Sequence, residues 1–367
     1  MFRADKSALA AALALTTQAV ERRNTIPILS NVLIQRDGQT MIATASNLDI
    51  EVATRFKAEM GTSFVAFTCP ASTLKDIVAK LPDGAEVTID ESDTKVTVKA
   101  GRSKFSLQTL PEADFPTMAA GDMPTQFTVN AVALSKAMKG VQFAISTEET
   151  RYYLNGIYMH AEEGALLLVA TDGHRLSKRT IAADLLDNPL ASFEGVIIPR
   201  ATIGLILKLI EKQESVTVTL SDAKIRVAAG DTVITSKLID GTFPEYRRVI
   251  PINNETSVRI NATPMMQALE RVTAISSERG RAVRMEFSPG SLRMLVSNPD
   301  AGDAEDEIVI EGDADASIGF NGKYVLEALG HVGSEVVEFM LGDAGGPTIL
   351  KQLGQSADVI VVMPMRV

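Results

Sequence analysis

Three stretches of the chain share one pattern of apolar and polar positions. They are "FRADKSALAAAL" from Phe2, "FTVNAVALSKAM" from Phe127 and "VRINATPMMQAL" from Val258. In each, a short alternation of apolar and polar residues predicts a strand, and apolar residues spaced three and four apart then predict an amphipathic helix. The same strand–helix unit is therefore expected three times, which indicates an internal repeat.

The first two copies keep a constant offset along the predicted helix. The apolar stripe of the first copy returns 125 residues later, first as Leu9, Leu13, Thr16 and Val20 and then as Leu134, Met138, Val141 and Ile145. Asp5, Asn130 and Asn261 end the three strands, where a side-chain oxygen is expected to cap the first helical N–H groups. Agreement at several positions supports a true repeat.

A second strand–helix unit also recurs. In "VAFTCPASTLKDIVAKL" and "GVIIPRATIGLILKLI", Pro70 and Pro199 precede helical patterns, and "IGFNGKYVLEALGHVGSEVVEFML" is the third copy. Alternating strands broken by turn residues follow each helix. We predict an α+β protein of three similar domains, each with two helices packed on antiparallel sheets. Segments containing glycine, proline and polar residues place these domains at 1–122, 123–253 and 254–367.

The six predicted helices carry an unusual share of the positive charge. They span roughly 5–23, 72–80, 130–145, 200–212, 262–279 and 321–331. They hold 13 Lys and Arg against 7 Asp and Glu, whereas the whole chain of 367 residues has a net charge of −10. Solvated helix faces could explain this, but helices that all face one way would form a surface suited to a phosphate backbone. The chain has no zinc-ligand spacing, RNP-type aromatic pattern or basic zipper that reads bases.

The cysteine content, the N-terminal segment and the lengths of the apolar runs indicate the cellular compartment. The one cysteine, Cys69, excludes an intrachain disulfide framework, and a buried thiol in a reducing cytosol is expected. The opening "MFRADKSALAAALALTTQA" has the cations and apolar run of a signal peptide, but Asp5 and Ser7 interrupt it and its apolar residues follow helical spacing. No apolar run approaches the roughly 18 residues of a membrane span. A cytoplasmic protein is therefore expected.

The segment "VATDGHRLSKRT" gathers polar side chains that raise the question of catalysis. A hydrolase that uses Asp172 and His174 would need a nucleophile or a second base. The chain has no G-x-S-x-G elbow, H-E-x-x-H pair or P-loop, and His160 and His331 lack metal-ligand spacing. Asp172 also fits an ordinary turn. No metal or cofactor is predicted.

Four motifs, "RYYLNG", "ATDGHRL", "FPEYRRVIP" and "VVMPMRV", occur in order with the repeats. Together they resemble the bacterial DNA sliding clamp family, the beta subunit of DNA polymerase III. The resemblance covers essentially the whole chain. It implies a non-catalytic processivity factor, a homodimer whose subunits close head to tail into a ring with helices lining the hole. Double-stranded DNA would then be held by topology, without sequence-specific contacts.

The resemblance also implies a pocket for short linear motifs of partner proteins. These partners are the replicative polymerase alpha subunit, the clamp loader, other polymerases and repair proteins. Carried over by match, the pocket comprises Arg151, Tyr152, Leu154, Thr171, Gly173, His174, Arg175, Leu176, Pro244, Arg248, Val249, Val361, Val362, Met363, Pro364, Met365 and Arg366. Methionine is flexible and polarizable, which suits a site that accepts varied peptides. Arg175 and Arg366 are expected to donate to peptide carbonyls.

Two further surfaces follow from the resemblance. Cations that face DNA are predicted at Arg22, Arg23, Lys75, Lys80, Lys136, Lys139, Arg200 and Lys208. The head-to-tail contact is predicted to join a basic and apolar end to an acidic and apolar end, comprising Arg102, Lys104, Phe105 and Leu107 and, opposite them, Ala274, Ile275, Asp300 and Glu305. The alternative for these residues is strand-edge charge that only prevents aggregation.

Overall fold

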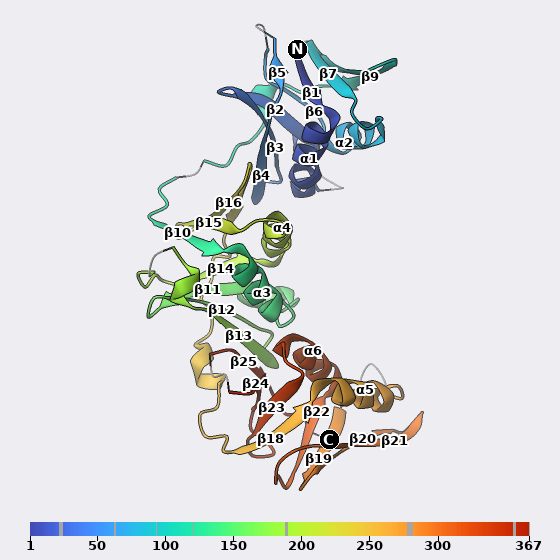
Figure 1. Cartoon of the computed structure of the whole chain (residues 1–367), viewed down its shortest axis with the longest axis vertical. Helices are drawn as coiled ribbons and strands as arrows, with labels where there is room; N and C mark the ends of the chain where they lie inside the picture. The colour runs from blue at the N-terminus through green and yellow to red at the C-terminus, as the bar shows by residue number, and fades with distance from the viewer. Residues whose placement is uncertain are drawn as a thin grey trace. The chain divides into compact units, whose positions relative to one another are not determined.

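The computed structural model describes residues 1–21, 25–61, 64–92, 94–119, 121–187, 190–276, 282–354 and 357–366 (Figure 1). They divide into two compact units. Unit 1 comprises Met1–Ser135, Leu186–Asn188 and Ala201–Leu238, and unit 2 comprises Lys136–Leu185, Pro189–Arg200 and Ile239–Val367. Each unit thus combines elements of two predicted domains.

The described residues form six α-helices, one at each predicted helical pattern. They are α1 (Lys6–Thr16), α2 (Ala71–Lys80), α3 (Ala131–Gln142), α4 (Arg200–Ile210), α5 (Ala262–Thr273) and α6 (Gly322–Val332). Short 3-10 helices are η1 (Thr17–Ala19), η2 (Pro27–Ser30), η3 (Glu112–Asp114), η4 (Glu149–Leu154), η5 (Ala183–Leu185) and η6 (Tyr246–Val249). α1 packs against α2 in unit 1, as α5 does against α6 in unit 2 (Figure 1).

Unit 1 contains two antiparallel sheets. The smaller has the order β5 (Glu59–Met60), β1 (Phe2–Asp5), β7 (Glu86–Ser92), β8 (Lys95–Ala100) and β9 (Ser103–Gln108). The larger has the order β10 (Thr125–Asn130), β15 (Ser215–Leu220), β16 (Lys224–Ala229), β17 (Thr232–Lys237), β4 (Ile50–Phe56), β3 (Thr40–Ser46), β2 (Asn31–Asp37) and β6 (Phe67–Pro70). This larger sheet continues from the second predicted domain into the first because β17 pairs with β4.

Unit 2 repeats this arrangement. Its larger sheet has the order β14 (Val196–Pro199), β11 (Gly156–Glu162), β12 (Ala165–Thr171), β13 (Arg175–Ile181), β25 (Val359–Val362), β24 (Thr348–Gln352), β23 (Val336–Leu341) and β18 (Thr256–Asn261). Its smaller sheet has the order β21 (Gly302–Val309), β20 (Ser291–Asn298), β19 (Ala282–Ser288) and β22 (Ala316–Asn321). Here the pairing of β25 with β13 makes the larger sheet continuous.

The two larger sheets are joined at equivalent strands in the same register. Ser236 of β17 lies opposite Ile50 of β4. Val362 of β25 lies opposite Arg175 of β13. Arg175 comes 125 residues after Ile50, which is the offset of the sequence repeat. The repeat therefore extends from the sequence to the way in which neighbouring domains join.

The side chains at these two joins differ in chemistry. In unit 1, the hydroxyl oxygens of Thr54 and Thr232 lie 3.0 Å apart. The equivalent positions in unit 2 hold Arg179 and Asp358, whose nitrogen and oxygen atoms are 3.7 Å apart. Burial lowers the pKa of the Arg179 guanidinium. One join thus contains neutral hydroxyls and the other an ion pair.

The starts of the helices correct part of the capping prediction. Asn130 does accept a hydrogen bond from the Ala133 N–H at 3.0 Å, but Asp5 and Asn261 make no side-chain cap. In all three copies, the first helical N–H donates to a backbone carbonyl at Ala85, Glu214 or Glu335, just before the strand that pairs with the one preceding the helix. In the first and third copies, a contact distant in sequence therefore takes the place of the expected side-chain cap.

Helices α1 and α5 end six or more residues before their predicted ends. The expected ranges 5–23 and 262–279 become α1 and α5, which end at Thr16 and Thr273. The Thr16 hydroxyl donates to the Ala12 carbonyl at 2.7 Å, and the Thr273 hydroxyl donates to the Leu269 carbonyl at 2.6 Å. Such bonds from a side chain to the preceding turn weaken a helix, which agrees with its ending here.

The cores contain the predicted apolar stripes. Leu9 and Leu13 are buried in unit 1 beside Phe2 and Cys69. Met265 and Leu269 occupy the corresponding core of unit 2. Cys69 is a free buried thiol, and burial raises its pKa to about 12.

Candidate functional site

The segment that raised the question of catalysis is the turn between β12 and β13. The Asp172 carboxylate accepts the backbone N–H groups of His174 and Arg175, each at 3.0 Å. Gly173 has a φ of +86°, a left-handed conformation that favours glycine. The Thr171 hydroxyl donates to the Arg175 carbonyl at 2.6 Å. Asp172 therefore serves as a turn residue whose carboxylate is engaged by backbone.

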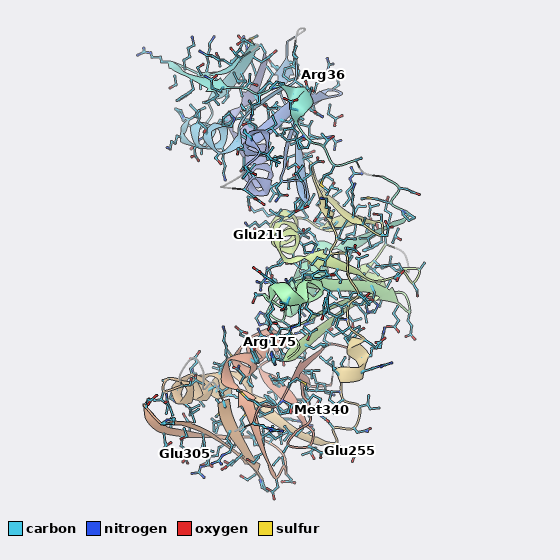
Figure 2. The ribbon with its side chains drawn as sticks, turned by 180° about the vertical axis from the view of Figure 1, so that it is seen from behind. Arg36, Arg175, Glu211, Glu255, Glu305 and Met340 are labelled. Carbon is cyan, nitrogen blue, oxygen red and sulfur yellow. The ribbon has the colours of Figure 1, made fainter. Side chains whose placement is uncertain are left out.

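Arg175 connects this turn to helix α6 and to the residues after α3 (Figure 2). Its Nε donates to Asp172 at 3.1 Å, its Nη1 forms an ion pair with Glu327, and its Nη2 donates to the Phe143 carbonyl at 2.7 Å. Its Cζ lies 4.5 Å from the centre of the Tyr324 ring. The guanidinium is thus engaged by the protein's own groups, and its donation to a partner peptide stays a prediction.

A cavity of about 270 Å³ lies beside this turn in unit 2. It is lined by Arg151, Tyr153, Leu154, Thr171, Gly173, Arg175, Leu176, Pro244, Glu245, Tyr246, Val249, Val361 and Met363. Leu154, Leu176 and Val361 also belong to one buried apolar cluster. An apolar hollow with a few polar groups is the usual form of a ligand site. Most of the predicted pocket residues are thus brought together.

The other predicted pocket residues do not line this cavity. They are Tyr152, His174, Arg248, Val362, Pro364, Met365 and Arg366. Val362 packs in the core on the other side of β25, because successive residues of a strand point to opposite faces. His174 is exposed, and its ring stacks on Tyr324 with 6.0 Å between centroids. The Met365 N–H donates to the Gly319 carbonyl at 2.8 Å.

Three lining residues were not predicted: Tyr153, Glu245 and Tyr246. Tyr153 lies between the predicted residues Tyr152 and Leu154, and Glu245 and Tyr246 directly follow the predicted Pro244. Tyr153 and Tyr246 lie in 3-10 helices η4 and η6, where the side-chain direction turns by roughly 120° per residue. A motif match cannot tell which of two neighbours faces inward. Burial raises the pKa of Tyr246 to about 12.

Of the predicted interface residues, Lys104, Phe105, Leu107 and Glu305 lie on two strands that end their sheets, and the others lie in the turns next to β9, β21 and α5. In the part of the chain that the structure describes, β9 pairs only with β8 and β21 only with β20. Glu305 of β21 is exposed (Figure 2), as are Lys104 of β9, Arg102, Ala274 and Asp300. Leu107 is buried in the core of unit 1, and Phe105 and Ile275 pack against the cores of their units.

The predicted DNA-facing cations lie on the solvent sides of the helices. Lys80, Lys136, Lys139, Arg200 and Lys208 are exposed, and Lys75 is half-buried. The opposite side of α2 buries Leu74 and Val78. Arg22 and Arg23 lie outside the described residues. The described cations are therefore accessible to a ligand.

Family models match the chain from end to end. Residues 1–119, 128–245 and 247–366 match the N-terminal, central and C-terminal domains of the DNA polymerase III beta subunit. The chain belongs to this family, the bacterial beta sliding clamps.

Individual sliding clamps agree along their whole length. The beta sliding clamp of Caulobacter vibrioides is 39% identical over 371 residues and covers 99% of both chains. The crystal structure of the DNA polymerase III subunit beta from Pseudomonas aeruginosa matches with a TM-score of 0.96 and 35% identity, covering 100% of both chains. A clamp from Bartonella birtlesii bound to griselimycin matches with a TM-score of 0.93 and 40% identity, also covering 100% of both. The predicted fold of repeated clamp domains is confirmed.

As a sliding clamp, the chain is a non-catalytic processivity subunit of DNA polymerase III. The hydrolase alternative is wrong: Asp172 is occupied by backbone N–H groups and Arg175, and the family is not catalytic. Among the described residues, no group of three or more His, Cys, Asp or Glu could hold a metal ion. No helix in that part of the chain is long and apolar enough to cross a membrane.

Proposed function

We propose that two copies of the chain close head to tail into a ring around double-stranded DNA. The observation that carries this proposal is the repeated join between domains. Strand β9 has the place in the repeat that β17 and β25 have, and β21 has the place of β4 and β13. In the described residues, β9 and β21 are the members of this set that have a partner strand on one side only. A second copy supplies both partners.

The repeat also fixes a register for the proposed join. In the join of unit 1, Val233 lies opposite Ala53. The equivalent residues of β9 and β21 are Lys104 and Glu305. The register therefore places a lysine of one copy opposite a glutamate of the other, which is a stabilising cross-strand pair.

Charge also disfavours a symmetric pairing. Strand β21 carries Asp303, Glu305 and Glu307 at alternate positions, so two β21 strands would repel each other. Strand β9 carries the opposite charge: its Lys104 lies directly opposite Lys99 of the neighbouring strand β8. Pairing β9 with β21 brings lysines to carboxylates. Two unlike surfaces that meet head to tail form a closed ring when the rotation between copies closes.

In this proposal the helix cations line the hole and face the DNA phosphates. Lys80, Lys136 and Lys139 are exposed on helices, whereas the chain as a whole has a net charge of −10. Attraction between exposed charges and phosphate is diffuse and weakened by salt, and it does not depend on base sequence. Such contact lets a closed ring slide.

The cavity beside Arg175 is proposed to take short linear motifs of the polymerase alpha subunit, the clamp loader, other polymerases and repair proteins. Its apolar lining, with Leu176 and Val361, suits apolar anchor residues. Tyr153, Tyr246 and Arg151 are of the residue types that dominate binding energy at interfaces. Such partners act on chromosomal DNA, so the proposed location is the cytoplasm.

Retention on DNA tests the ring. A clamp loaded onto a nicked circle should stay bound at moderate salt and should slide off once the circle is cut, with a lifetime at least about tenfold shorter because only topology holds it. Release is measured with fluorescent clamp and bead-bound DNA. Cut DNA with both ends blocked by a bound protein is the control and should retain the clamp. Equal lifetimes on open-ended and circular DNA would contradict the proposal.

Shortening the C-terminus tests the pocket. Removing residues 363–367 deletes Met363, which lines the cavity and donates its N–H to the His174 carbonyl at 2.9 Å. We expect at least an about tenfold loss of affinity for a polymerase alpha subunit peptide, measured by fluorescence anisotropy, and no change in the mass of the dimer. Removing only 366–367 is the control and should have a smaller effect. Full affinity after the longer deletion would place the site elsewhere.

A further inference from the structure

Strand β11 presents three alternate side chains to the segment that follows β17. Tyr158 stacks on Phe243 with 4.7 Å between ring centroids and 3° between ring planes. The His160 Nε2 lies 2.9 Å from the Tyr246 hydroxyl. Glu162 accepts a hydrogen bond from Arg247 at 2.6 Å. Alternate residues of a strand share one face, so a single face of β11 holds this segment at three points.

The held segment forms one wall of the cavity. It supplies Pro244, Glu245, Tyr246 and Val249 to the lining. The Tyr246 side chain is buried, lines the cavity, and bonds to His160 through its hydroxyl. A displacement of this hydroxyl would therefore move a wall of the cavity.

The equivalent strand of unit 1 shows that the fold does not require this arrangement. Strand β2 has Leu33, Gln35 and Asp37 at the positions of Tyr158, His160 and Glu162, as the offset of 125 places them. Leu33 packs with Phe115 in an apolar cluster. Asp37 forms its ion pair with Arg55 of β4, in the same sheet, whereas Glu162 pairs with the connecting segment.

We propose that His160 is a positioning residue for the partner pocket: its hydrogen bond to Tyr246 holds the 243–249 wall in the shape that receives a partner's motif. The inference rests on the proposed function of the cavity. His160 does not line the cavity and acts through Tyr246. It is therefore expected to set affinity without touching the peptide.

The surroundings favour a neutral imidazole. His160 is 6% exposed, and burial followed by the nearby Arg247 cation lowers its pKa. Lys178 also lowers the pKa, while Glu162 and Glu245 oppose the shift. Protonation would thus add a buried charge beside two cations, so the arrangement is most stable above the ordinary histidine pKa of about 6.5 and weakens as the pH falls.

Binding of a labelled peptide with the clamp-binding motif of the polymerase alpha subunit tests the inference. His160→Leu keeps the bulk but removes the hydrogen bond, and its affinity should fall about fivefold, the equivalent of one hydrogen bond. His160→Gln can still bond to Tyr246 and should stay within about twofold of the wild type. Tyr246→Phe should match His160→Leu, and the double variant should be no weaker than either single variant.

A matched control and the pH profile separate positioning from general stability. Gln35→Leu changes the equivalent residue of unit 1 and should leave peptide affinity unchanged. The wild-type affinity should fall between pH 7.5 and about 5.5, below the ordinary histidine pKa, while that of His160→Gln should not. If His160→Leu bound as tightly as the wild type, or His160→Gln as weakly as His160→Leu, the inference would be overturned. Absence of wild-type binding would instead contradict the proposed pocket.

Discussion

Replacing Arg175 with methionine is expected to lower the free energy of unfolding of unit 2 by about 3–5 kcal/mol, the usual cost of removing one member of a buried ion pair. The Arg175 side chain is 9% exposed and binds Asp172 and Glu327. Without it, Asp172 loses its ion-pair partner, Glu327 keeps only the more distant Lys323, and the Phe143 carbonyl loses a donor. Methionine keeps much of the apolar stem. The loss is therefore attributable to the guanidinium.

Tyrosine fluorescence during urea unfolding measures this effect selectively. The five tyrosines are Tyr152, Tyr153, Tyr158, Tyr246 and Tyr324, which all lie in unit 2, and the chain has no tryptophan. Arg151→Met is the control, because the ion pair of Arg151 with Glu148 is exposed and should contribute little. Equal midpoints for the two variants would show that the Arg175 contacts do not hold unit 2 together.

Replacing Lys104 with glutamate should weaken the dimer at least about tenfold, because like charges opposite each other destabilise paired strands. The proposed register puts this residue against Glu305 of the second copy at both joins of the ring. Combining it with Glu305→Lys should recover most of the affinity. Sedimentation over a range of protein concentrations measures the dissociation constant.

The control for this exchange is Lys95→Glu on the neighbouring strand. Lys95 lies opposite Gln108, on the same face as Lys104 but away from the proposed contact with Glu305. The dimer should tolerate this change. A double variant weaker than Lys104→Glu alone would disprove the register, even if the dimer itself were observed.

Local patterns predicted the repeated elements well, because apolar spacing reports which face of a helix or strand is buried. Leu9 and Leu13 lie in the core as their spacing predicts. The features that were not predicted depend on contacts between residues distant in sequence. The first N–H of α1 donates to the Ala85 carbonyl, and the Asp5 side chain makes no cap. Nothing near Asp5 in the sequence indicates that this distant carbonyl is the acceptor.

The candidate site shows the same limit. A motif match included both Val361 and Val362, yet strand geometry sends one to the cavity and the other to the core. The role of Arg175 depends on Glu327, which follows it by 152 residues. No spacing rule connects such a pair. Tyr246 was missed because a motif match does not give the direction of a side chain in a 3-10 helix.

The matching geometry of the joins and their different chemistry have a consequence for how a ring opens. Thr54, Thr232 and Arg179 are shielded from solvent, and the domains that they connect remain tethered by covalent chain. Lys104 and Glu305 lie exposed, so dissolved ions would weaken their attraction in the proposed ring. We therefore expect high salt or a loading factor to part the contact between copies before either internal join, which would make that contact the entry point for DNA.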